Sequence, residues 1–128
     1  MRYEEFIDRV AEHVTIGSRE QAIIATQATL ETLGERLDRD ERDDLASQLP
    51  HPLKEYLLAR PDTDRFLLEE FYNRVSARAG VRRTHGVRQA QAVMSVLQEA
   101  IAQGEWQDML DSLPDDYRVA FSVDREVV

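Results

Sequence analysis

The chain has 128 residues, 42% of them hydrophobic, and 25 Asp and Glu against 16 Lys and Arg give a formal net charge of −9. This composition fits one compact domain, excludes a disordered or fibrous chain, and disfavours binding to nucleic acid or anionic lipid through overall charge. The lack of cysteine excludes disulfides and cysteine-based zinc sites, and three histidines are too few for most transition-metal sites, so we expect no metal and no cofactor.

Two amphipathic helices are predicted at the start of the chain. The first spans about 3–14, and the second spans about 18–38, where Ser18 followed by Gln21 is expected to cap it. The buried stripe of the first helix contains Phe6, Val10 and Val14. The second carries a ladder with alternating steps of three and four residues: Ile23, Thr26, Leu30, Leu33 and Leu37.

Two shorter helices are expected next. Asp40 is the predicted N-cap of the third, which ends at Leu49 and Pro50 because proline disfavours the α conformation in the residue before it. A short fourth helix follows, with Leu53, Tyr56 and Leu57 on its apolar side. Residues 59–64 are predicted to be a linker.

The second half repeats this series. Residues 3–14 align with residues 68–79 at a shift of 65 with five of twelve positions identical, and later blocks align at a shift of 64. The pattern predicts helices over about 67–79 and 84–103, a third ending at the Leu-Pro pair of 113–114, and a fourth. Thr84 and Gly104 are the expected caps, Tyr117 and Phe121 the expected apolar residues of the fourth helix, and residues 123–128 a loose tail.

We interpret the correspondence as a tandem duplication. It predicts an all-α fold: a helical bundle of two pseudo-symmetric repeats, about 1–58 and 65–122, with about four helices each. A unit of about 60 residues is marginal alone, so the repeats are expected to share one core within a single domain, residues 1–128.

Three motifs in this order resemble a known family. They are FIDRV from Phe6 to Val10, ATLETLGERL from Ala28 to Leu37 and ERDDLASQLP from Glu41 to Pro50, and they are echoed by FYNRV from Phe71 to Val75 and EWQDMLDSLP from Glu105 to Pro114. In these motifs the chain resembles the bacterial and archaeal domain of unknown function 2267 family over about residues 3–121. The resemblance implies an all-helical fold and no assigned activity. In one departure, no polar residue directly precedes the first helix of the second repeat.

The repeated carboxylates have structural interpretations. Glu4 and Glu5, like Glu69 and Glu70, lie in the first turns of predicted helices, where the helix dipole favours acids. Glu41 and Asp44 recur as Glu105 and Asp108, and we expect them to contact Arg9 or Arg74. No catalytic constellation is recognisable, so we predict that the chain is not an enzyme.

The charge asymmetry between the repeats is the main functional signal. Residues 71–98 contain no acid, whereas the matching residues 6–34 have a net charge of −2. The five arginines of this stretch are Arg74, Arg78, Arg82, Arg83 and Arg88. They are candidates to hold an anionic ligand or an acidic partner surface, and the alternative is pairing with the acidic first repeat or with another copy of the chain.

Trp106 is the remaining candidate. Arg42 occupies the matching place in the first repeat, and Trp106 is expected either at an interface or in the packing between repeats. The functional hypothesis is a non-enzymatic helical interaction or scaffold module that self-associates or docks an unknown acidic protein through the Arg-rich face. The alternative is a protein that binds a small anionic or apolar ligand in a pocket between the repeats, beside Arg74, Arg78 or Trp106.

Nucleic acid and membranes are not expected as partners. The sequence has no aromatic-interleaved basic stripe and no zinc finger. It has no apolar run near the ~20 residues of a membrane span, and its first residues, MRYEEFIDRV, lack a signal peptide's apolar core. We therefore expect a cytoplasmic protein.

Overall fold

The computed structural model describes residues 1–13 and 16–122, so the predicted tail and Val14 lie outside the described residues. The described residues form eight helices and no strand, which confirms the all-α prediction. In chain order they are α1 (Tyr3–Ala11), α2 (Arg19–Arg36), α3 (Arg39–Ala46), α4 (Leu53–Leu58), α5 (Leu68–Ala79), α6 (Arg83–Ala100), α7 (Gln103–Asp111) and α8 (Asp115–Phe121). None of these helices is long and apolar enough to cross a membrane.

Helix starts differ in detail from the expectations. Ser18 caps α2 as predicted, because its hydroxyl accepts the Gln21 N–H at 3.1 Å. The predicted caps Asp40, Thr84 and Gly104 are wrong, since each lies inside the first turn of α3, α6 or α7. The residues before these helices are extended and provide no side-chain cap. Residues suited to capping are also tolerated within a first turn, so residue type alone misplaced these starts by one or two positions.

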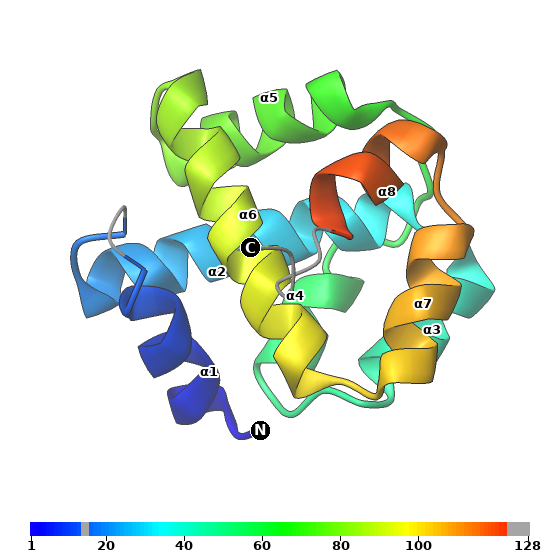
Figure 1. Cartoon of the computed structure of the whole chain (residues 1–128), viewed down its shortest axis with the longest axis horizontal. Coiled ribbons are helices and arrows are strands. Elements are labelled where there is room, and N and C mark those ends of the chain that lie inside the picture. The colour runs from blue at the N-terminus through cyan, green and yellow to red at the C-terminus, as the bar shows by residue number, and fades with distance from the viewer. Residues whose placement is uncertain (14–15, 123–128) are drawn as a thin grey trace, which may run out of the picture.

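The long helices α2 and α6 have 18 residues each and pack against one another at the centre of the molecule (Figure 1). The bounds of α6 equal those of α2 shifted by 64. The helix that opens each half also packs against the long helix of the other half, α1 on α6 and α5 on α2. The buried apolar side chains consequently form one cluster that draws on both halves. The duplication itself stays an interpretation of the sequence.

Polar contacts fix the start of the second half, and one of them joins it to the first half. Arg36 of α2 and the hydroxyl of Tyr117 of α8 both donate to the Phe66 carbonyl, at 2.6 and 2.7 Å. Asp116 of α8 accepts the Leu68 N–H at 2.9 Å and so satisfies a free amide at the start of α5. The polar cap that the sequence lacks before α5 is thus provided from 48 residues away.

Candidate functional site

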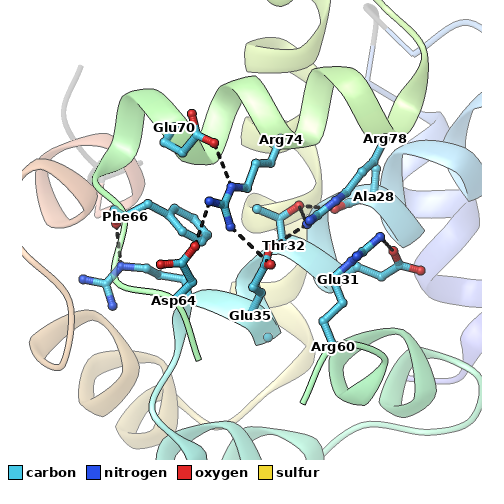
Figure 2. Close-up of polar contacts among 12 residues, drawn as sticks. Ala28, Glu31, Thr32, Glu35, Arg60, Asp64, Phe66, Glu70, Arg74 and Arg78 are labelled. Atoms are coloured by element: carbon cyan, nitrogen blue, oxygen red, sulfur yellow. Dashed lines mark hydrogen bonds and ion pairs between the residues drawn. The ribbon is translucent and has the colours of Figure 1, made fainter. Parts of the chain in front are cut away.

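Arg74 lies on α5 at the centre of a network of acidic side chains (Figure 2). Its nitrogen atoms lie 2.8 Å from Glu70, 2.8 Å from Asp64 and 3.2 Å from Glu35, and its guanidinium carbon lies 4.1 Å from the centre of the Phe66 ring. The hydrogen bonds from Arg74 and then Asn73 lower the pKa of Glu70. Desolvation alone would lower the pKa of Arg74, but its three acidic partners outweigh desolvation and raise it. Arg74 therefore stays charged and balanced within the chain.

Arg78 lies one turn further along α5 and shares Glu35 with Arg74 (Figure 2). Its Nη1 donates to the Thr32 hydroxyl at 2.9 Å and lies 2.9 Å from Glu35 Oε1, without the alignment of a hydrogen bond. The Glu35 side chain is 16% exposed, so its charge is poorly solvated and benefits from two arginines. Two arginines of the stretch thus form ion pairs with the first half of the chain.

The same kind of contact occurs between α1 and α6. Arg9 of α1 pairs with Glu99 of α6, as Arg74 of α5 pairs with Glu35 of α2. Arg9 and Arg74 are related by the shift of 65, and Glu35 and Glu99 by the shift of 64. The recurring arginines therefore join the halves, but through Glu35 and Glu99. The expected contacts of Arg9 or Arg74 with Glu41, Asp44, Glu105 or Asp108 are absent among the ion pairs of the described residues.

The remaining three arginines lie at the start of α6, and we call Arg82, Arg83 and Arg88 the α6 arginine surface. All three are exposed. Arg83 pairs with Glu69 and lies 5.9 Å over the Tyr72 ring. Arg82 and Arg88 form no ion pair with any residue in 1–13 or 16–122. Arg74, Arg78 and Arg83 thus have acidic partners within the chain. Arg82 and Arg88 are exposed and have none among the described residues.

Trp106 is 2% exposed and belongs to the core. Of the two expected positions, an interface or the interior, the structure shows the interior. Arg42 on α3 is 5% exposed, and its Nη1 donates to the carbonyls of Gly34 at 3.1 Å and Arg60 at 3.3 Å. These carbonyls lie at or just beyond the C-terminal ends of α2 and α4, where intrahelical donors are lacking. The equivalent positions 42 and 106 are thus both buried. Position 42 holds an arginine that binds helix-end carbonyls, and position 106 holds an aromatic ring.

A cluster of carboxylates lies where α3 contacts α7, and we call Glu41, Glu105, Asp44 and Asp108 the carboxylate cluster. One oxygen from each of Glu41, Asp44 and Glu105 lies within 4.8 Å of the other two. Glu41 and Glu105 each bury one oxygen that has no hydrogen-bond partner among the described residues. Burial raises the pKa of Glu41 from 4.5 to about 8, helped by its contact with Glu105 and by the charges of Glu105, Asp44 and Asp108.

The carboxylate cluster was visible in the sequence only as a recurring pattern. The shift of 64 relates Glu41 to Glu105 and Asp44 to Asp108, and a residue meets its own equivalent only where the halves contact through the same element. Three carboxylate oxygens could hold a hard cation such as Ca²⁺, but this ion takes about six to eight oxygen ligands. A shared proton needs only two oxygens, which suits this arrangement better.

Three shallow hollows are lined by described residues, and Trp106 borders none of these three. The largest of the three has a volume of about 610 Å³ and lies on the first half and the linker. Its walls are Arg39, Arg42, Asp43, Leu58, Pro61, Asp62 and Thr63. Two smaller hollows, of about 360 and 210 Å³, lie between the halves, one beside Arg9 and Glu99 and the other beside Arg78 and Glu31. Only Arg78 of the predicted pocket residues borders any of these hollows.

The comparisons with known proteins identify a family without assigning an activity. No match was found among curated proteins. One family model matches, over residues 3–120, which include all eight helices except the last residue of α8. The chain therefore belongs to the family described as uncharacterized conserved protein (DUF2267), as its three ordered motifs suggested.

Proposed function

We propose that this chain is a non-enzymatic helical interaction module and that it docks an acidic protein segment on the α6 arginine surface. The observation that carries the proposal is the pair of exposed arginines, Arg82 and Arg88, which have no acidic partner in the described part of the chain. Arg74 and Arg78 are excluded from the docking surface because Glu35 and its neighbours already balance their charges. Trp106 is excluded because it is buried.

The start of α6 supports the same conclusion. The first N–H groups of an 18-residue helix carry partial positive charge, and at α6 neither a side-chain cap nor a first-turn acid offsets it. The equivalent start of α2 has both, in Ser18 and Glu20. Thr84 and His85 are exposed there as well, and Arg88 follows them by one turn. An extended acidic segment lying across the start of α6 would therefore meet free amides and guanidinium groups.

A binding measurement with a defined probe tests the proposal. The probe is a fluorescein-labelled polyglutamate peptide of about ten residues, followed by anisotropy at low and at physiological salt. Arg82→Gln and Arg88→Gln should each weaken binding by about two- to fivefold, as expected for exposed charge pairs, and added salt should reduce the difference. Arg39→Gln is the matched control, because Arg39 is also exposed on a helix and forms no ion pair among the described residues.

Two outcomes would overturn the proposal. Binding by Arg88→Gln at the wild-type level, or equal loss in Arg39→Gln, would show that the α6 arginine surface is not the docking site. Light scattering tests whether the partner is instead a second copy of the chain. A dimer that forms with rising concentration and is lost in Arg88→Gln, with no peptide binding, would replace the acidic partner with a second copy of the chain.

A further inference from the structure

The contact between α3 and α7 brings like charges together at a partly buried position. Glu41 projects from α3 and Glu105 from α7, and one carboxyl oxygen of Glu41 lies within 4.8 Å of one of Glu105. Two ionised carboxylates at this separation repel, and each buried oxygen lacks a donor among the described residues. One proton between them would remove the repulsion and provide the missing hydrogen bond.

No basic side chain in residues 1–13 or 16–122 forms an ion pair with the carboxylate cluster. The groups that act most strongly on Glu41 are all acidic, namely Glu105 and Asp108 from α7 and Asp44 from α3 itself. Two further helices pack nearby, α4 on α3 and α8 on α7.

The charged groups of α4 and α8 either contact residues outside the carboxylate cluster or form no ion pair. On α4, Glu55 contacts His51, and Lys54 makes no ion pair with a described residue. On α8, Arg118 pairs with Asp115, and Asp116 binds the amide of Leu68. None of these groups forms an ion pair with Glu41 or Glu105, so within the described residues a proton can provide the counter-charge for the carboxylate cluster.

We propose that Glu41 and Glu105 share one proton and form a pH-sensitive clasp between the two halves of the molecule. In the closed state the protonated carboxyl donates to the facing carboxylate. At alkaline pH a base from solvent removes this proton, both groups carry charge, and the contact between α3 and α7 loosens. The inference does not depend on the α6 arginine surface, because the two features lie on different helices.

The direction of the pH dependence follows from proton linkage. Burial and the facing Glu105 raise the pKa of Glu41 to about 8 in the folded chain, from an ordinary value of 4.5. Between these values the folded state binds one more proton than the unfolded state. Stability from the clasp is therefore complete below about pH 4.5 and is lost as the pH rises toward 8. The equilibrium constant for unfolding should rise with pH by at most about tenfold per unit across this window.

The test compares urea unfolding of the full chain from about pH 5.5 to 8.5, a window in which ordinary carboxyl groups are already ionised. Constant ionic strength and a chelator exclude effects of salt and of stray cations. Glu41→Gln retains a donor for Glu105 and cannot lose it, so its unfolding constant should change less with pH than that of the wild type. It should also be the more stable protein at the alkaline end. Asp43→Asn, an exposed acid on the same helix, is the matched control and should keep the wild-type slope.

Parallel pH profiles for the wild type and Glu41→Gln would overturn the clasp. If Glu41→Gln does not fold, Glu105→Gln repeats the experiment from the other side of the contact. A third measurement needs no variant: carboxyl ¹³C chemical shifts of the wild type should include a glutamate that titrates well above its normal range. Titration of all glutamates below about pH 5.5 would overturn the proposal.

Discussion

Replacing Gly34 with alanine tests the packing of α4 against α2. Gly34 is buried on α2, and a Cβ built there would lie 1.8 Å from the carbonyl oxygen of Leu57 and 2.9 Å from its carbonyl carbon. Ordinary contacts begin near 3.4 Å, and the opposing atoms are backbone, which cannot rotate away. Gly34→Ala must therefore separate the two helices, and it also disturbs the hydrogen bond from Arg42 to the Gly34 carbonyl.

The expected size follows from two opposing effects. Overpacking costs about 1–3 kcal/mol, with a backbone clash near the upper end, whereas alanine gains about 1 kcal/mol over glycine inside a helix. Gly34→Ala should thus lower the free energy of unfolding by about 2 kcal/mol and the melting temperature by about 7 °C. Gly104→Ala is the matched control, since nothing lies within 4 Å of its Cβ position in α7. It should stabilise the chain by up to about 1 kcal/mol.

Urea denaturation of the two variants and the wild type, followed by circular dichroism, measures both changes. If α2 and α4 approach as closely as the structure shows, Gly34→Ala must lower the free energy of unfolding and Gly104→Ala must raise it. A Gly34→Ala variant as stable as the wild type, or more stable, would refute the reasoning, because the steric cost would then not exceed the gain in helix propensity.

Three further variants test the contacts between helices by the same urea assay. Glu35→Gln removes the charge that Arg74 shares and should cost about 1–3 kcal/mol; a wild-type midpoint would show that this ion pair contributes nothing. Arg42→Met should cost about 1–3 kcal/mol, because two helix-end carbonyls lose their donor, and a stabilised variant would contradict the anchoring role. Asp116→Ala should cost about 1 kcal/mol through the lost cap on Leu68, with faster amide exchange at that residue; unchanged exchange would speak against the cap.

The helices could be predicted because apolar residues spaced by three and four positions lie on one helix face, and this face is the one that is buried. The ladder that includes Leu30 and Leu33 is one example, and both residues are fully buried on α2. Helix starts were less accessible to sequence reasoning. The cap on α5 comes from Asp116, which lies 48 residues away from the amide it binds, and no local pattern reports such a partner.

The candidate sites, too, were predictable from the sequence only in part. The acid-free stretch identified the arginines of α5 and of the start of α6, but only the fold shows that Glu35 pairs with both Arg74 and Arg78 while Arg82 faces solvent. The sequence also contained the recurrence of Glu41 at position 105. Sequence reasoning pairs acidic side chains with arginines. The contact between the two equivalent acids therefore became apparent only from the packing of α3 against α7.

Chemical-shift mapping of the ¹⁵N-labelled chain with the polyglutamate peptide tests the proposed docking site most directly. The backbone amides of Arg83, Thr84 and His85 open α6 and would lie against the acidic segment. Their signals should move most on titration, and the movement should shrink in Arg88→Gln but not in Arg39→Gln. Largest shifts around Arg39 and Asp43, or small shifts spread over the whole chain, would contradict an acidic partner on the α6 arginine surface.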